Sequence, residues 1–469
     1  MNSANEAVAG AGGVVGGAVA GASYRTQARQ PARGTTFANI ALVLLLMSLL
    51  IDGLPAGAAV LREFGARLAN FLLVIAWMTL IVRRLSGGRA LGVKWHEAYL
   101  LVAVLAGAPL LNLPVALMQS PVGAHLALVD WMKQFLMLGW ALVSFCIWKR
   151  IVAGMDPRRY CALIAISALL PVLAFILEYI DRSGTTVAVL DIFRMKRDVR
   201  PSSLATEPSI YGAYIAFIWP LLLYYSLAGG RVLGRLAARI FLVVALVTAL
   251  MSGARTFAVV LLLQLLYFFY WAIERQRGWG ARIRSLLLAV CFTAAAVLVL
   301  AARLMSVVDI ARNESDITRI GDTVTGINVA VAHPLVGVGI GEFGNFFAQY
   351  APAFALRSIE VEKDIAGSAE YRASTFNMFV RLSVEFGIPL GVTFAYLVLR
   401  PIIKAPKWTT GERFVLYAAL SAVGGVGFWM SQDTYGYQPA ILSLAVLSVC
   451  ATGMMRTGVR SRAAAVRTA

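Results

Sequence analysis

Charge is scarce in this chain of 469 residues. Only 14% of the residues are charged, whereas soluble globular domains carry about 25%. The chain has only three histidines and four cysteines, and they form no His-Glu-x-x-His or other zinc spacing and no disulfide framework. The sequence also lacks a Walker loop and a Gly-x-Ser-x-Gly motif. The scarcity of charge excludes an ordinary soluble domain. Because the metal, nucleotide and hydrolase motifs are missing, we expect no cofactor. The chain therefore either catalyses without a cofactor or is not an enzyme.

Apolar residues fill the space that charge leaves, at 59% of the chain and a mean hydropathy of +0.75. A transmembrane helix needs about 20 such residues in succession. Twelve apolar stretches come near that length: 37–54, 65–82, 97–118, 128–148, 160–180, 207–228, 237–252, 256–273, 284–305, 375–399, 413–430 and 438–454. We therefore predict an all-α polytopic membrane protein with about twelve transmembrane helices.

The short connections on one side of these helices, together with both termini, hold most of the 42 Lys and Arg residues. Basic residues mark the cytoplasmic side. We predict a flexible cytoplasmic tail over 1–36, a membrane domain over 37–454 and a second cytoplasmic tail over 455–469. Two outer segments, 181–206 and 306–374, are long, and the longer one joins the ninth and tenth helices. The net charge of +18 is spread in short clusters, which argues against a nucleic-acid partner.

Residues 339–344 (GIGEFG) fit the G-x-G-x-x-G pattern of dinucleotide-binding loops. That pattern requires a surrounding βαβ unit, whereas this stretch lies in the long outer segment. We therefore disfavour a nucleotide site. Glycines also let a chain turn sharply or approach another backbone closely, and we expect that role here.

Several polar residues gather at the outer ends of the predicted helices. Arg255 is either an interfacial anchor or a fixed guanidinium at the mouth of a cavity. Arg200 stands before a proline at the end of the first long segment. Thr206 is the expected N-cap of the next helix and Pro208 suits its first turn, which together make a good helix start. Glu207 between them either complements the helix dipole or acts as a general base at the membrane surface.

Asn377, Arg381 and Glu385 are spaced i, i+4, i+8 in the tenth apolar stretch and share one helical face. An ionisable residue as deep as Glu385 usually faces the interior of a helix bundle. An Arg381–Glu385 ion pair that stabilises packing is one interpretation, and a functional site is the other. Gly387 and Pro389 then predict a kink.

The remaining candidates lie in the longer outer segment. Arg312, Asp316, Arg319 and Asp322 form a charged run before the glycines, and such runs are usually surface decoration. His333 is the one histidine in that segment. From the residues alone, neither the charged run nor His333 has an assigned role.

Three stretches resemble the bacterial O-antigen ligase and polymerase superfamily: SGARTFAVVLLL (252–263), TRIGDTVTGINVAVAHPLVGVGIGEFGNFF (318–347) and TFNMFVRLSVEFGIPLG (375–391). The resemblance covers roughly 37–454. It implies a GT-C-like multi-span glycosyltransferase of the bacterial inner membrane, with its active site facing the periplasm. The implied donor is a glycan on undecaprenyl pyrophosphate. An acceptor hydroxyl attacks the anomeric carbon of that glycan and inverts its configuration, and no metal ion takes part.

The resemblance also implies roles for particular residues. Arg255 and Arg319 stand where the family's phosphate-binding arginines stand. Arg200, Arg381 and Asn377 are weaker candidates for binding the pyrophosphate or glycan. Fixed guanidiniums stabilise the charge that a departing pyrophosphate gains.

Ligases commonly carry a histidine, their proposed base, immediately before the family's asparagine, and this chain has Phe376-Asn377 there. The tripeptide EPS at 207–209 resembles a motif of capsule and exopolysaccharide polymerases. We therefore favour a polymerase, with Glu207 as the base and His333 as the second choice.

Two other functions stay open. An O-antigen ligase would use lipid A–core as the acceptor, whereas a polymerase uses a second lipid-linked repeat unit. A transporter or flippase is compatible with twelve spans, although the sequence shows no internal repeat. Expected partners are the lipid-linked glycan, membrane lipids, and a chain-length regulator and a flippase.

Overall fold

The computed structural model describes residues 33–51, 67–85, 112–118, 120, 124–181, 190–191, 201–229, 234–276, 278–280, 282–284, 286–287, 290, 294, 314–365, 373–408, 413–430, 432, 434–453 and 455. Within these residues every regular element is a helix, which confirms the all-α prediction. The predicted spans 97–118 and 284–305 lie largely outside the described residues, as do both predicted tails except 33–36 and Met455.

The chain divides into two compact units, Met1–Ile40 and Ala41–Ala469. Of the first unit, the structure describes only residues 33–40, which are the first turns of one helix. That helix starts at Arg33, four residues before the predicted span. The second unit contains every residue discussed below.

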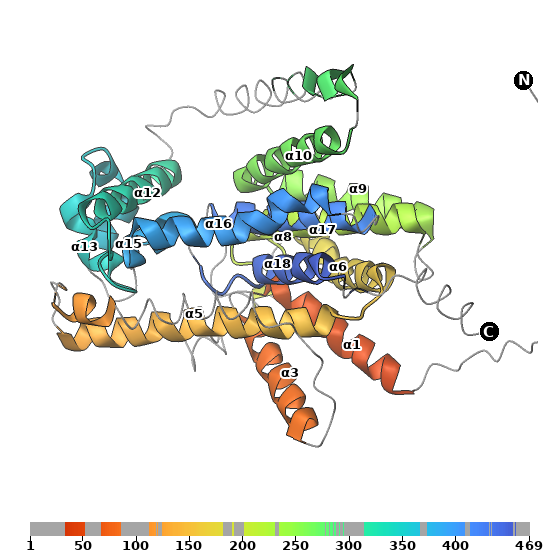
Figure 1. Cartoon of the computed structure of the whole chain (residues 1–469), viewed down its shortest axis with the longest axis horizontal. Helices are drawn as coiled ribbons and strands as arrows, with labels where there is room; N and C mark the ends of the chain where they lie inside the picture. The colour runs from red at the N-terminus through yellow and green to blue at the C-terminus, as the bar shows by residue number, and fades with distance from the viewer. Residues whose placement is uncertain are drawn as a thin grey trace, which may run out of the picture. The chain divides into compact units, whose positions relative to one another are not determined.

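The described helices follow one another in this order: α1 (Arg33–Met47), η1 (Ser48–Leu50), α3 (Leu68–Leu85), α5 (Ala124–Val152), α6 (Pro157–Ile180), α8 (Pro208–Ala228), α9 (Arg235–Met251), α10 (Arg255–Arg275), α12 (Glu314–Ala332), α13 (Phe343–Tyr350), η4 (Ala355–Arg357), α14 (Ile359–Ile365), α15 (Met378–Phe386), α16 (Ile388–Lys404), η5 (Ala405–Lys407), α17 (Arg413–Trp429) and α18 (Gln438–Ala451). Figure 1 shows α5, α18 and α16 running side by side, and α12, α13 and α15 together at one end of the second unit.

Among the described residues, five helical segments are long and apolar enough to cross a membrane: Ala127–Val152, Pro157–Ile180, Pro208–Ala228, Arg255–Arg275 and Ile388–Lys407. Shorter apolar helices include Arg413–Trp429 and Gln438–Ala451. The protein is thus a helical membrane protein. The total of twelve spans and the GT-C-like architecture stay predictions.

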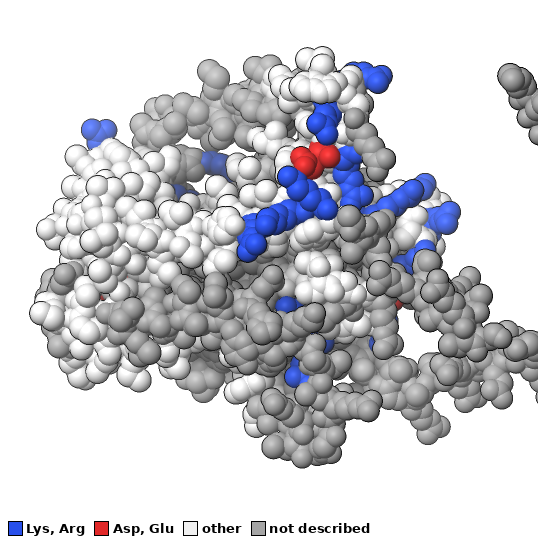
Figure 2. All heavy atoms as spheres, viewed as in Figure 1, with Lys and Arg blue, Asp and Glu red and all other residues white. Residues whose placement is uncertain are grey.

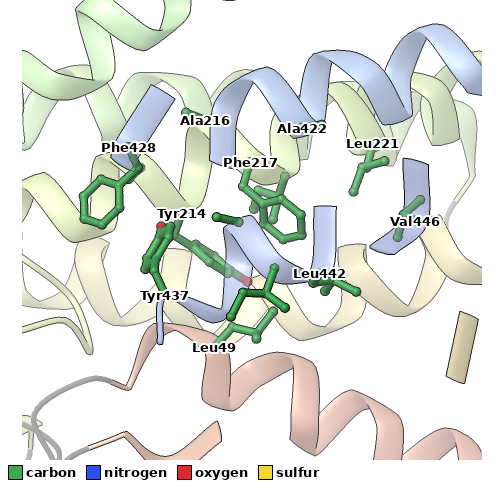
Figure 3. Packing of buried hydrophobic residues seen from close by; sticks show 14 of the residues in the cluster. Leu49, Tyr214, Ala216, Phe217, Leu221, Ala422, Phe428, Tyr437, Leu442 and Val446 are labelled. Atoms are coloured by element: carbon green, nitrogen blue, oxygen red, sulfur yellow. The ribbon is translucent and has the colours of Figure 1, made fainter. Parts of the chain in front are cut away.

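The apolar centre of the second unit is formed by α8, α17 and α18, with α5, α6 and α10 packed around them. Figure 3 shows side chains of this apolar centre, which come from η1, α8, α17 and the start and middle of α18: Leu49, Tyr214, Ala216, Phe217, Leu221, Ala422, Phe428, Tyr437, Leu442 and Val446. Cys161 and Cys450 are buried in the helical bundle and Cys146 is partly buried, all as free thiols.

One polar side chain ties three of these helices together. Gln264 of α10 is fully buried, and its Nε2 donates to the carbonyls of Ala216 at 2.7 Å and Leu420 at 2.8 Å. Its Oε1 accepts from the indole of Trp219 at 2.7 Å. Gly424 makes room for this bond, since a Cβ there would lie 2.5 Å from the Ala216 oxygen. Because a buried amide is costly unless it is hydrogen-bonded, these bonds fix the relative positions of α8, α10 and α17.

The outer segment 306–374 is not an extended loop. Its described residues fold into α12, α13 and α14, joined by short turns. These helices share a small apolar cluster whose members include Val329, Phe347 and Val361. This folding was not predicted, because segment length alone does not distinguish an irregular loop from a folded cap.

The break expected near Gly387 is confirmed. Helix α15 ends at Phe386 and α16 begins at Ile388, with Gly387 between them at φ +87°. A helix that ends inside a protein leaves carbonyl groups without partners. Here the glycine-rich stretch supplies the donors: the N–H of Val338 donates to Val384 at 2.9 Å, and the N–H of Gly339 to Glu385 at 3.2 Å.

Glycine is required on both sides of this contact. A Cβ at Gly337, where φ is +74°, would lie 2.3 Å from the carbonyl oxygen of Val384. A Cβ at Gly387 would lie 2.3 Å from the carbonyl oxygen of Leu335. The glycines of 333–344 therefore permit a close backbone approach, as expected, and what they approach is the end of α15. No strand borders them in the described residues, so the βαβ unit of a nucleotide site is missing there.

Candidate functional site

Glu207 lies at the N-terminus of α8. It is the N-cap residue, with extended backbone (φ −137°), and Pro208 is the first helical residue, as predicted. The expectation that Thr206 caps this helix is wrong. The cap falls one residue later because the fixed φ of proline suits the first helical position, which leaves Glu207 as the flanking residue. The Oγ of Ser209 donates to Oε2 of Glu207 at 3.0 Å.

A buried carboxylate fixes the chain that leads into Glu207. Oε2 of Glu178 in α6 accepts the N–H of Ser202 at 3.0 Å and of Ser203 at 2.8 Å. The hydroxyl of Ser203 donates to the carbonyl of Pro171 at 2.6 Å, and Ser203 has a positive φ of 61°. Glu178 was not predicted as a site residue, although a carboxylate inside an apolar span is a recognised signal.

Arg319 reaches Glu207 from α12. Its Nη2 lies 3.8 Å from Oε2 of Glu207, and the two side chains are 32% and 42% exposed. The guanidinium also lies 5.5 Å from the centre of the Phe376 ring, which is within cation–π range. Phe376 has a positive φ of 48°, a conformation that costs energy for a bulky residue. The structure thus brings together the predicted base, one predicted phosphate-binding arginine and the residue that stands where ligases carry histidine.

A cavity of about 210 Å³ opens beside Glu207. The cavity is large enough for several waters or for the polar end of a substrate. Its wall is mixed in polarity, with Arg67, Gln432, Thr434 and Tyr437 facing apolar residues. Nη2 of Arg67 donates to the hydroxyl of Thr434 at 3.2 Å. The acceptor side of a transfer reaction would need such a wet, partly polar space next to its base.

A buried polar network supports one wall of the cavity. Nε2 of Gln438 donates to Asn70 at 3.2 Å and to Ser144 at 3.3 Å, and its Oε1 accepts from Trp148 at 3.0 Å. Neither Arg67 nor Gln438 was predicted. The signal that could have found Gln438 is the polar run at 431–438, SQDTYGYQ, between two apolar helices.

Arg381 and Glu385 form the ion pair that their spacing indicated, with Nε of Arg381 3.0 Å from Oε1 of Glu385. The carboxylate is 1% exposed. It also accepts the N–H of Gly341 at 3.0 Å and the hydroxyl of Tyr435. The guanidinium lies 4.5 Å from the centre of the Tyr435 ring. These contacts support the packing interpretation of the pair, and they connect α15 to the glycine stretch and to the α17–α18 connection.

Asn377 holds the start of α15. Its side-chain oxygen accepts the N–H of Phe379 at 3.0 Å and of Val380 at 3.2 Å, which is the standard N-cap arrangement. Its Nδ2 donates to the carbonyl of Met430 at 3.5 Å. Asn377 therefore orders the backbone next to Phe376, and a contact with substrate stays a prediction.

His333 lies away from the Glu207–Arg319 pair. It follows the last residue of α12, fourteen residues beyond Arg319, which is about 21 Å along a helix. Its ring packs edge-on against Phe346 and Tyr350, and its Nε2 lies 3.4 Å from the Tyr350 hydroxyl. The two predicted bases are therefore not neighbours.

The structure places the remaining predicted residues differently. Arg255 is the exposed first residue of α10, and Ala254 before it packs on Gly212, near the start of α8. Arg255 is thus at the same end of α8 as Glu207. Arg200 and Arg312 lie outside the described residues, as does the side chain of Asp316. Asp322 is fully buried, so it is not surface decoration.

Residues 240–395 match the family described as O-antigen ligase. The resemblance to the O-antigen ligase and polymerase superfamily is confirmed. The matched O-antigen ligase region contains Arg255, Arg319 and the α15–α16 break, whereas Glu207 precedes it. Members of this family are glycosyltransferase-like enzymes that use lipid-linked glycans. None of the curated proteins matches the chain. In the part of the chain that the structure describes, no group of three His, Cys, Asp or Glu side chains could hold a metal.

Proposed function

We propose that the protein polymerises undecaprenyl-pyrophosphate-linked oligosaccharide repeat units at the periplasmic face of the inner membrane. The observation that carries this proposal is the approach of Arg319 to Glu207 beside Phe376. It joins a carboxylate that can accept a proton to a guanidinium that can hold a phosphate. Glu207 also lines a cavity that an acceptor hydroxyl can enter.

In the proposed reaction the acceptor hydroxyl, placed in the cavity, gives its proton to the Glu207 carboxylate. Its oxygen forms a bond to the anomeric carbon of the donor glycan. The bond from that carbon to the pyrophosphate oxygen breaks from the opposite face, and the electron pair leaves with the lipid pyrophosphate. Arg319 and Arg255 hold the growing negative charge, since arginine–phosphate hydrogen bonds strengthen as charge develops. The configuration at the anomeric carbon is inverted.

The 3.8 Å contact suits such a cycle, because it is longer than a tight charge-assisted hydrogen bond of about 2.7–2.9 Å. Arg319 can turn from Glu207 to the donor phosphate when the donor arrives. The Glu207 carboxylate is then free to accept a hydrogen bond from the acceptor hydroxyl. Donor binding would thereby activate the base for the acceptor.

Phe376 favours a polymerase over a ligase. A phenyl ring cannot accept a proton, so the position that carries the proposed base in ligases is chemically silent here. Arg319 links Glu207 to that position, because its guanidinium contacts both the Glu207 carboxylate and the Phe376 ring. The assignment of the base to Glu207 rests on this replacement of one proton acceptor by another.

The test uses cells that lack the native gene and express the full chain or a variant. We expect Glu207→Gln and Arg319→Ala to abolish chain extension and leave single repeats on the surface glycan. Glu362→Gln and Arg357→Ala are matched controls, because both side chains are exposed on the outer segment. Long glycan chains in both site variants would refute the proposal. Accumulation of undecaprenyl-linked polymer would instead identify a ligase.

Reconstituted turnover separates an enzyme from a transporter. Purified protein in detergent, supplied with a defined lipid-linked repeat unit, is expected to lengthen the glycan without any membrane gradient. A product of two or more repeats, visible by gel or mass spectrometry, supports the polymerase. Intact substrate alone would leave the transporter as the better explanation.

A further inference from the structure

A second cavity, of about 480 Å³, runs between α5, α15, α16 and α18. Most of its wall is apolar, with Leu138, Leu142, Phe145, Leu382, Val398 and Leu444 among the lining residues. It lies apart from the cavity at Glu207, and the two share no lining residue. The proposed transfer reaction assigns no role to it. We call it the α5–α16 groove.

One end of the α5–α16 groove is strongly basic. Lys149, Arg400 and Lys404 all line it, and the lining includes no Asp or Glu. Lys149 lies in the last turn of α5, and Lys404 is the last residue of α16. Arg400 is one helical turn before Lys404 and therefore on the same face. All three charges are at the same end of the groove, near the C-terminal ends of two helices, where cations are favoured.

Lys149 is unusual among these three because it is buried, with 4% of its surface exposed. Among the described residues, no Asp or Glu carboxylate forms an ion pair with Lys149. Most of the Lys149 side chain is thus buried, while the residue lines the groove, where an anion can approach its ammonium group. Its position on the groove wall makes an anion inside the groove the natural counter-charge. Figure 2 shows the wider setting, with Lys and Arg side chains gathered over α9, α10 and α16 and few over α12 and α13.

The depth of the groove matches one leaflet. Leu138 and Lys149 are eleven residues apart on α5, which is about 17 Å along a helix. Half of a hydrocarbon core of about 30 Å is about 15 Å. An amphiphile with its head at the basic end would thus reach to about the bilayer midplane. The far end, at Met378 and Tyr435, approaches the Arg381–Glu385 pair.

We propose that the α5–α16 groove binds an anionic glycerophospholipid of the leaflet at the C-terminal ends of α5 and α16, with its phosphate on Lys149, Arg400 and Lys404. The charge pattern of the sequence predicts that this is the cytoplasmic leaflet. The polyprenyl donor is a poorer fit, because its pyrophosphate belongs with Arg319 and Arg255 at the other end of the helices. The phospholipid is a bound component of the protein, and its binding does not depend on the proposed polymerase activity.

Native mass spectrometry of the purified full chain in detergent tests this site. Phosphatidylglycerol, phosphatidylethanolamine and undecaprenyl phosphate are each titrated, against the unaltered chain and the triple variant Lys149→Gln, Arg400→Gln, Lys404→Gln. One basic residue near an anionic head group changes the affinity by about fivefold, so the triple variant should bind phosphatidylglycerol about 100-fold more weakly. Lys404→Gln alone should cost about fivefold, and it changes an exposed side chain that folding does not need.

Lys407→Gln is the matched control. Lys407 is close to Lys404 in sequence but pairs with Glu274 at 3.2 Å and does not line the groove, so phosphatidylglycerol binding should be unchanged. Ala141→Phe fills the apolar part of the groove and leaves the three charges; it should also weaken binding. The proposal is overturned if the triple variant and Lys404→Gln bind phosphatidylglycerol as the unaltered chain does. Equal binding of phosphatidylethanolamine, or preferred binding of undecaprenyl phosphate that depends on these three residues, would overturn it as well.

Discussion

The guanidinium of Arg319 lies 3.8 Å from the carboxylate of Glu207, although one comes from the outer helix α12 and the other from the start of α8. This pair joins the folded outer segment to the membrane helices at the cavity that we assign to the acceptor. Exposed pairs of this kind contribute little to stability, about 0–1 kcal/mol. Removing one partner should therefore affect the reaction far more than the fold.

Arg319→Lys tests whether the shape of the guanidinium matters as well as its charge. Lysine keeps the charge but loses the planar fork that binds phosphate through two bonds and stacks on an aromatic ring. We expect kcat/KM for the lipid-linked donor to fall at least tenfold, with no loss of thermal stability. Arg357→Lys, on an exposed residue of η4, should leave both quantities unchanged. Full activity of Arg319→Lys would show that only the charge is needed.

Phe376 is expected to orient Arg319 through its ring. Phe376→Tyr keeps an aromatic face 5.5 Å below the guanidinium and should retain most activity. Phe376→Leu keeps bulk but removes the π-face, which is worth about 0.5–1 kcal/mol at an exposed site, so activity should fall about two- to fivefold. Both variants face the same backbone strain at φ +48°, so their comparison isolates the ring. Equal turnover of the two in the reconstituted assay would remove Phe376 from the site.

Glu178→Gln should loosen the turn that delivers Glu207. The carboxylate accepts two backbone N–H groups from Ser202 and Ser203, and hydrogen bonds to a charged group contribute about 1.5–3 kcal/mol. We expect a lower melting temperature in detergent and a lower kcat, with KM for the donor nearly unchanged, because the phosphate-binding arginines stay in place. Glu274→Gln removes a carboxylate from a partly exposed pair with Lys407 and should change the melting temperature little. A Glu178→Gln protein with normal kcat would mean that the turn is held by other contacts.

The sequence predicted the parts of this molecule that depend on local pattern. Apolar runs gave the all-helical membrane class, the Gly387–Pro389 pair gave the break after α15, and the i, i+4 spacing gave the Arg381–Glu385 pair. The central contact of the site joins Arg319 and Glu207, which are more than a hundred positions apart in the sequence. No helical or strand period relates such residues, so the sequence could nominate both but could not pair them.

The same limit applies to the residues that were missed. Glu178, Arg67 and Gln438 are polar groups within or beside apolar segments. Their importance follows from what they touch across the bundle, such as the turn before Glu207 or the wall of its cavity. The glycine stretch shows the reverse case. Its need for close backbone approach was predicted, while its partner, the end of α15, required the structure.

The close contact between Gly337 and the end of α15 should not tolerate a side chain at position 337. In Gly337→Ala the new Cβ would lie 2.3 Å from the Val384 carbonyl oxygen, and the residue would keep a φ of +74°. Left-handed backbone costs about 1–2 kcal/mol for alanine, and relief of the overlap adds about 1–3 kcal/mol. We expect a destabilisation of about 2–5 kcal/mol, measured as a lower melting temperature in detergent.

Gly139→Ala is the control. Gly139 lies within α5 with no atom near its Cβ position, and alanine is favoured over glycine inside a helix by about 0.5–1 kcal/mol. Gly139→Ala should therefore be neutral or slightly stabilising. If Gly337→Ala melts with the unaltered chain, then the backbone of 333–344 has room to move away from Val384, and the carbonyls at the end of α15 do not depend on these glycines.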